Sequence, residues 1–155
     1  ACEVAAYAKL NGSSFYEELL KIYVNNKYYK EHLISITKKG MDGAAEIKQM
    51  LSDMRNNPIT EIDGEKIETL SDYNASTRKN LITGEVSEID MPKSNVLIYQ
   101  TASGTRIAAR PSGTEPKIKF YFSVNAPLDK TENAEKVETE LDSKIQRIIK
   151  EMKLS

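Results

Sequence analysis

The sequence contains little cysteine or histidine, no tryptophan and no long run of apolar residues. Its single cysteine, Cys2, excludes an internal disulfide framework and is typical of a reducing compartment, so we expect a cytoplasmic protein. The single histidine, His32, excludes a histidine-rich metal site. The longest apolar runs reach four or five residues, whereas a membrane-spanning helix needs roughly 20, so we expect no membrane partner.

An excess of charge of one sign is also absent. The chain has 22 Lys and Arg residues against 23 Asp and Glu residues, which gives a net charge of -1. Nucleic-acid-binding domains usually carry a basic field, so this balance predicts no nucleic-acid partner. Hydrophobic residues make up 39% and charged residues 29% of the 155 residues, which suits one globular domain with a core and a small appendage.

The first part of the chain predicts two helices. It begins without a methionine, and residues 1–11 already have the pattern of an amphipathic helix, so we expect a piece of a longer protein. Ser14 and Glu17 predict a capping box for a second helix that ends near Asn25 and buries an apolar face, including Phe15. Residues 1–40 are interpreted as the helical tail of a preceding domain, with residues 28–37 as a strand or extended linker at the boundary.

Residues 41–155 predict an α+β domain. Its sheet has about four mostly antiparallel strands, with two helices on one face and the other face open to a partner or a cleft. The first expected elements are a helix over 44–55 capped by Asp42, a hairpin at Asp63-Gly64, and a long loop with local order over 72–94. Strands over 95–100, 105–109 and 118–124 follow, and a helix over 129–152 ends the domain.

The segment from Arg110 to Lys117, with the sequence Arg-Pro-Ser-Gly-Thr-Glu-Pro-Lys, is the strongest candidate for a binding site. The arginine offers a planar fork for phosphate oxygens, and successive backbone N–H groups after it can form an anion-binding nest. On physical grounds alone, a rigid surface loop remains the alternative. The candidate phosphate-binding residues are Arg110, Ser112, Gly113, Thr114, Lys117 and Lys119.

This segment resembles the phosphate-binding loop of the α-D-phosphohexomutase superfamily, which includes phosphoglucomutases, phosphomannomutases and phosphoglucosamine mutases. The helical start resembles the end of that family's third domain, so the resemblance covers nearly the whole chain. Further segments agree with the phosphoglucomutase and phosphopentomutase-like branch, namely residues 71–73, 81–84, 92–97 and 117–122.

The resemblance implies a four-domain enzyme in which this chain is the C-terminal domain, with a TATA-box-binding-protein-like fold. Such enzymes transfer a phosphoryl group through a phosphoserine and a bisphosphorylated sugar, with Mg²⁺ in an acidic loop of the second domain. The fourth domain holds the phosphate that is not reacting. Carried over, this role falls to Arg110, Ser112, Gly113 and Thr114. Lys119 stands where phosphoglucosamine mutases carry arginine. A lysine there keeps the positive charge but lacks the planar guanidinium group that binds two oxygens at once.

Several motifs of that family are missing from the sequence. There is no Ser-His-Asn-Pro nucleophile segment, no Asp-Gly-Asp-x-Asp-Arg metal loop and no Gly-Glu-Glu sugar loop. We therefore expect no catalytic residue, metal or cofactor in this chain, and no mutase activity from the chain alone. Its partners are then a sugar phosphate and the upstream domains. The alternatives are a non-catalytic module that binds phosphorylated ligands or nucleic acid, and a purely structural dimerisation domain.

Overall fold

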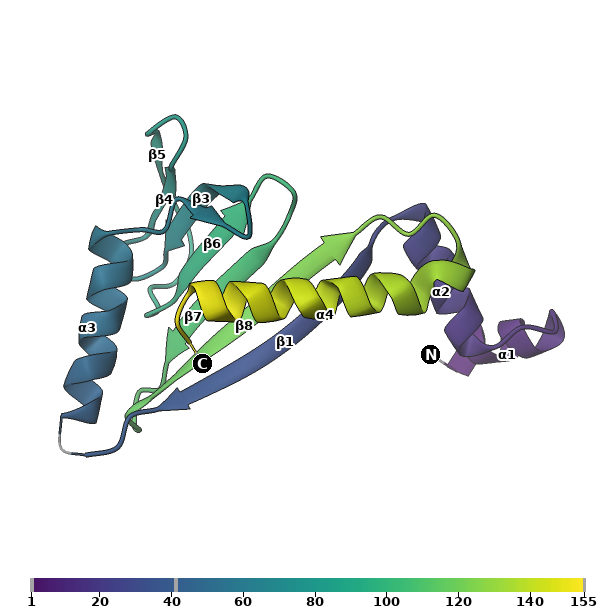
Figure 1. The fold of residues 1–155 in the computed structure, drawn as a ribbon, viewed down its shortest axis with the longest axis horizontal. Coiled ribbons are helices and arrows are strands. Elements are labelled where there is room, and N and C mark those ends of the chain that lie inside the picture. Colours follow the sequence, from purple (N-terminus) through teal and green to yellow (C-terminus); the bar gives the residue numbers. More distant parts are fainter. Residues whose placement is uncertain (1, 41, 155) are drawn as a thin grey trace.

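The computed structural model describes residues 2–40 and 42–154. Ala1, Met41 and Ser155, which the predicted domain ranges include, lie outside the described residues. The fold is α+β, built on a mostly antiparallel sheet, as predicted. Helix α4 (Ala134–Glu151) lies across one face of this sheet, while helices α1 (Cys2–Leu10) and α2 (Phe15–Asn25) stand beyond one end and helix α3 (Gly43–Asn56) lies at the other (Figure 1). None of the helices in the described part of the chain is long and apolar enough to cross a membrane.

The strand order is β1-β8-β7-β6-β3-β4-β5, with β2 paired to β3 outside this path, and every pair is antiparallel. The strands are β1 (Tyr28–Thr37), β2 (Glu61–Ile62), β3 (Glu65–Asp72), β4 (Thr77–Asn80), β5 (Val86–Glu88), β6 (Leu97–Thr101), β7 (Arg106–Pro111) and β8 (Lys117–Ala126).

The core lies between the sheet and the helices α3 and α4. Alternate residues of β8 point into it, and none of them is more than 1% exposed: Ile118, Phe120, Phe122 and Val124. They pack in one cluster with the buried stripe of α4, which includes Leu141, Ile145 and Ile148. Burying each such side chain stabilises the fold by roughly 1.5–3 kcal/mol. The opposite face of the sheet therefore carries the remaining residues of the same strands, as the alternation predicts.

Two predicted local features are confirmed by their geometry. Ser14 accepts a hydrogen bond from the Glu17 amide at 3.1 Å, and the Glu17 carboxylate accepts one from the Ser14 amide at 3.0 Å, which completes the capping box of α2. Asp63 and Gly64 both have positive φ angles, 48° and 73°, and they connect β2 to β3 as a tight turn.

The sheet is larger than the four strands expected. Residues 28–37 form β1, which pairs with β8 over ten residue pairs and lies inside the same sheet. The prediction of a long loop over residues 72–94 is wrong in part, because β4 and β5 form a hairpin there. These two strands are short, polar and mostly exposed at the sheet edge, so no alternation of apolar residues marks them in the sequence.

The helical hairpin of α1 and α2 packs on the sheet only near its end. Leu20 is buried in the common core, and the rings of Tyr23 and Tyr28 lie 4.8 Å apart between centroids. The prediction that Phe15 is buried is wrong, since 47% of its surface is exposed. Asp42 precedes α3 as predicted, but its side chain makes no capping hydrogen bond.

Candidate anion-binding site

The predicted binding segment connects β7 to β8 at the end of the sheet that lies near α3. Antiparallel pairing places Arg110 directly opposite Lys119, and Pro111 opposite Ile118. Since Ile118 and Ala109 point into the core, the neighbouring side chains of Arg110 and Lys119 point to the open face, where both residues are exposed. Two cations that stand nine residues apart in the chain are therefore nearest neighbours across one pair of strands.

A hollow of about 240 Å³ opens beside these two cations. Four of the six predicted residues line it: Arg110, Ser112, Gly113 and Lys119. Pro111 and Tyr121 complete the lining, so it contains two positive charges and no carboxylate. An anion placed there would meet a guanidinium fork, an ammonium group and the backbone of the loop, a donor set suited to phosphate.

The loop between the strands is ordered by its own hydrogen bonds. The Ser112 amide donates to the Lys117 carbonyl at 2.7 Å, and the Lys117 amide donates to the Glu115 carbonyl at 2.7 Å. The Ser112 hydroxyl oxygen accepts from the amides of Thr114 and Glu115 at 3.4 and 3.3 Å. Two of the amides that the sequence assigned to an anion nest thus point to Ser112. Both contacts are long, and a charged oxygen would be a stronger acceptor.

Neither the backbone conformation at position 113 nor the packing around it requires a glycine. Gly113 is absent from the positive-φ residues, and a Cβ built on it would meet nothing within 4 Å. Its lack of a side chain instead leaves the loop surface open where Gly113 lines the hollow.

Two predicted residues lie apart from this hollow. Thr114 lines a second hollow, of about 450 Å³, between the loop and α3, where its neighbours include Ile47, Lys48 and Leu51. Lys117 lines neither hollow, although strand alternation places it on the same face as Lys119. The structure therefore brings together Arg110, Ser112, Gly113 and Lys119, and leaves Thr114 and Lys117 at the margin.

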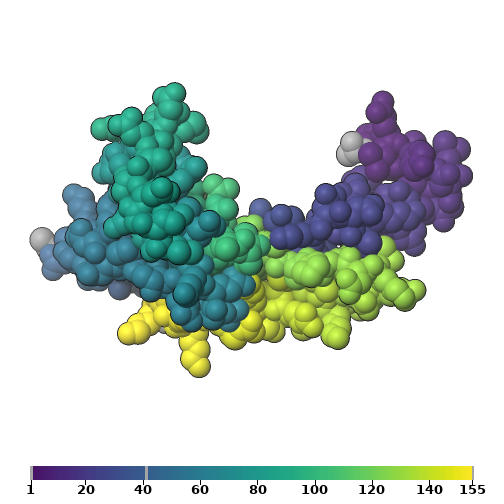
Figure 2. All heavy atoms as spheres, turned by 90° about the horizontal axis from the view of Figure 1, so that it is seen from above, coloured from purple at the N-terminus to yellow at the C-terminus, as the bar shows by residue number. Residues whose placement is uncertain are grey.

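Tyr121 was missed as a site residue by sequence reasoning. It lines the hollow beside Arg110 and also a larger one, of about 540 Å³, on the open face of the sheet. Figure 2 shows this face hollowed between the teal hairpin of β4 and β5 and the purple helices α1 and α2. The alternation along β8 already places Tyr121 on the same face as Lys119, and that was the available signal.

The described residues do not fit a resident metal. Within residues 2–40 and 42–154, no group of three or more His, Cys, Asp and Glu side chains lies close enough to hold an ion. The Mg²⁺ that the resemblance implies would need ligands beyond these residues.

Comparison with known proteins finds phosphoglucomutases among the sequence relatives. The chain is 40% identical over 123 residues to a phosphoglucomutase of Staphylococcus aureus strain MRSA252, a match that covers 79% of this chain and 22% of that protein. It is 37% identical over 114 residues to a phosphoglucomutase of Staphylococcus saprophyticus, covering 74% of this chain and 20% of that protein. The chain thus spans about a fifth of the length of these curated relatives.

Other comparisons add little. No protein-family model matches the chain. Among solved structures, the open form of the Paramecium phosphoglucomutase parafusin matches with a TM-score of 0.45 and 18% identity, over 95% of this chain and 25% of that one.

Proposed function

The chain belongs to the phosphohexomutase family as its C-terminal domain, and from this premise we propose that it holds the non-reacting phosphate of a sugar phosphate. The observation that carries the proposal is the cross-strand pair of Arg110 and Lys119 beside a hollow that no carboxylate lines. A phosphate dianion leaves water only where several donors and compensating positive charge replace its hydration. This pair supplies the charge, and the loop supplies further donors.

Each loop residue takes a distinct part in this proposal. Arg110 binds two phosphate oxygens with its planar fork, and Lys119 adds a point charge from the neighbouring strand. The Ser112 hydroxyl, which accepts from the amides of Thr114 and Glu115, turns to donate to the phosphate and frees these two amides. Gly113 keeps the entrance clear. Thr114 and Lys117 join the set only if the loop closes on its ligand.

For the parent enzyme we propose an isomerase that transfers a phosphoryl group within a sugar phosphate, through a phosphoserine and a bisphosphorylated sugar. The nucleophile, the Mg²⁺ ligands and the sugar-reading loop then lie in upstream domains, in a cytoplasmic protein, and this chain alone has no mutase activity. Binding energy gained at a remote phosphate serves to orient the reacting end of the substrate. We also propose that the domain boundary lies before Tyr28 rather than at residue 40, because β1 is part of the sheet.

The proposal is tested by titrating the ¹⁵N-labelled chain with inorganic phosphate and following its amide signals. We expect the signals of Gly113 and its neighbours to shift, and Arg110→Ala to weaken the affinity by about 10- to 100-fold, the range of a lost charged bidentate contact. Lys66→Ala is the matched control, because this exposed lysine lies on β3. Equal phosphate affinity in the Arg110→Ala variant and the unaltered chain would refute the proposal.

A further inference from the structure

Lys38 connects the loop of residues 112–116 to α3. Strand β1 ends at Thr37, which is paired with the first residue of β8 at the end of the sheet where this loop lies (Figure 1). The next residue, Lys38, donates a hydrogen bond from its backbone amide to the Pro116 carbonyl at 2.9 Å. The Lys38 ammonium lies 3.4 Å from the Glu46 carboxylate on α3. One residue therefore contacts the loop through its backbone and the helix through its side chain.

The hydrogen bond from Lys38 holds the loop from outside. Pairing of β7 with β8 fixes Arg110 and Lys119 at the two ends of the loop. Between them, the amide and the hydroxyl of Ser112 bond only within the segment itself. Among residues 2–40 and 42–154, the Lys38 amide makes the only hydrogen bond that joins residues 112–116 to a segment other than β7 and β8.

Gly43, the first residue of α3, packs directly on Lys38. Gly43 is buried, and a Cβ built on it would lie 2.5 Å from the Lys38 carbonyl oxygen, 3.1 Å from the carbonyl carbon and 3.2 Å from the Lys38 Cβ. Non-bonded carbon atoms are best separated by roughly 3.5–4.0 Å, so a side chain at this position must displace backbone atoms. Packing therefore requires a glycine at position 43, in contrast to position 113.

Helix α3 is fixed more firmly than Lys38. The Tyr99 hydroxyl donates to the Met54 carbonyl near the end of α3 at 2.6 Å, and Arg55 pairs with Asp72 of β3 at 2.9 Å. The apolar face of the helix is buried in the core. Lys38 lies beyond the last residue of β1 and outside the strand pairing. Added volume at the start of α3 would therefore move Lys38, and its amide would leave the loop.

We propose that Lys38 is a positioning residue for the anion site: its amide holds Pro116, and the bare backbone of Gly43 lets α3 support Lys38 in that place. The inference rests on the proposed function, since it assigns to these residues the ordering of a loop that binds phosphate. Neither Lys38 nor Gly43 lines the hollow beside Arg110, so both act on the anion only through the loop.

The hydrogen bond to Pro116 affects binding because it orders the loop before the anion arrives. The charges of Arg110 and Lys119 are held by the sheet and stay in place without it. The Ser112 hydroxyl and the amides that follow it belong to the loop, and ordering them at the moment of binding lowers the affinity by the free energy of that ordering. We therefore expect a smaller loss of affinity than the one that follows removal of Arg110.

The experiment titrates two variants of the ¹⁵N-labelled chain with inorganic phosphate. Gly43→Ala displaces Lys38 from the side of α3, whereas Lys38→Pro deletes the amide donor and leaves α3 untouched. We expect each to weaken phosphate affinity by about 2- to 10-fold, the net value of one backbone hydrogen bond. Hydrogen exchange provides a direct readout, because the Lys38 amide should exchange faster in Gly43→Ala than in the unaltered chain.

Gly104→Ala is the matched control for a loss of stability alone. Gly104 precedes β7, at the opposite end of that strand from the loop, and a Cβ on it would lie 2.9 Å from the Asn125 side-chain nitrogen. Gly43→Ala and Gly104→Ala should both lower the melting temperature. Only Gly43→Ala should also weaken phosphate binding, a change that a purely structural glycine would not produce.

The two proposals fail in different ways. If Gly43→Ala and Lys38→Pro bind phosphate as tightly as the unaltered chain while Arg110→Ala binds it more weakly, the positioning role is overturned and the phosphate site stands. An equal loss of affinity in Gly104→Ala would also overturn the positioning role, because the effect would then follow general stability. If Arg110→Ala leaves the affinity unchanged, the phosphate site falls and this inference falls with it.

Discussion

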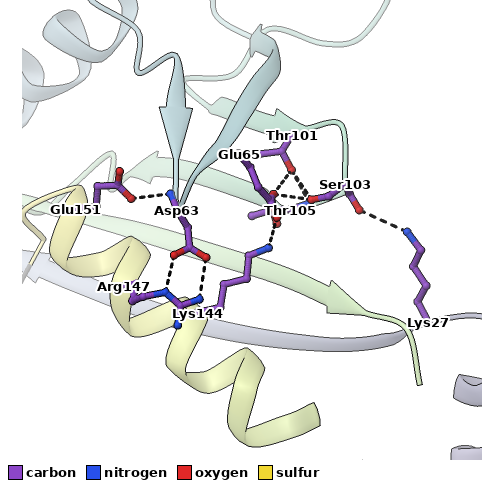
Figure 3. Close-up of polar contacts among 9 residues, drawn as sticks. All are labelled: Lys27, Asp63, Glu65, Thr101, Ser103, Thr105, Lys144, Arg147 and Glu151. Atoms are coloured by element: carbon purple, nitrogen blue, oxygen red, sulfur yellow. Dashed lines mark hydrogen bonds and ion pairs between the residues drawn. The ribbon is translucent and has the colours of Figure 1, made fainter. Parts of the chain in front are cut away.

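Lys144 of α4 donates a hydrogen bond to the carboxylate of Glu65 on β3, with an Nζ–Oε1 distance of 2.6 Å (Figure 3). The other carboxylate oxygen of Glu65 accepts from the hydroxyl groups of Thr101, Ser103 and Thr105, at 3.0, 2.6 and 3.3 Å. One carboxylate therefore joins the long helix, strand β3 and the turn between β6 and β7. These segments are far apart in the sequence, so the contact stabilises the tertiary arrangement rather than any single element.

This cluster predicts a stability that depends on pH. Burial raises the pKa of Glu65, but the hydrogen bonds from Lys144, Ser103 and Thr101 outweigh it, so the pKa lies below its ordinary value. A lowered pKa in the folded state contributes stability that is present above the unfolded pKa of roughly 4.3 and is lost as the pH falls through the folded pKa. We expect Glu65→Gln to lower the free energy of unfolding by roughly 1–2 kcal/mol at pH 7, allowing for partial exposure.

The measurement is urea denaturation of Glu65→Gln and the unaltered chain between pH 3 and pH 7. The difference between them should shrink as the pH falls below about 4. Glu61→Gln is the matched control, because Glu61 is exposed on the neighbouring strand β2. A difference that stays constant over the whole pH range would contradict the assignment.

Two glycines predict opposite outcomes for the same substitution. Gly104 has a φ of +98°, and a Cβ there would lie 2.9 Å from the Asn125 side-chain nitrogen, so Gly104→Ala should destabilise the fold by about 1 kcal/mol or more. Gly113 has neither constraint, so Gly113→Ala should leave the melting temperature unchanged and weaken inorganic phosphate binding. Thermal melts and phosphate titrations of both variants check this, and unaltered phosphate binding by Gly113→Ala would count against its place at the site.

Lys119→Arg predicts a gain of affinity. The position is exposed and opposite Arg110, and an arginine there would replace a point charge with a second planar fork. We expect inorganic phosphate to bind about 2- to 10-fold more tightly than to the unaltered chain, the net value of one added hydrogen bond of ordinary strength. Lys119→Ala should weaken the binding instead. An affinity insensitive to both substitutions would show that Lys119 does not contact the anion.

Local sequence signals correctly predicted two kinds of element. The first is held by contacts between residues close together in the chain, and the second buries one face and exposes the other. The capping box of Ser14 and Glu17, the Asp63-Gly64 turn and the alternation over residues 118–124 were all confirmed. The long loop over residues 72–94 was wrong in part, because β4 and β5 are held by pairing to each other and to β3. Because these edge strands are polar on both faces, their sequence lacks the alternation of apolar and polar residues by which a strand is recognised.

The candidate site follows the same division. Arg110, Ser112, Gly113 and Lys119 lie within one short motif, so the sequence was sufficient to select them. Tyr121 was missed although the alternation along β8 places it on the face of Lys119, because its partners in the sheet, Leu33 and Ala108, come from the distant strand β1 and from β7. Thr114 has the right chemistry in the right segment, but it lines the hollow beside α3 and not the one beside Arg110.

The sequence by itself determined the family, the α+β class and the position of the candidate anion-binding segment, because each depends on residue types and spacings along a continuous stretch of chain. Only the tertiary structure decided that residues 28–37 join the sheet and that Arg110 and Lys119 are neighbours across two strands of its open face. The physical reason is strand register. The register between strands that are distant in the sequence is set by the burial of one face of the sheet. The same register decides which side chains become neighbours on the opposite, open face.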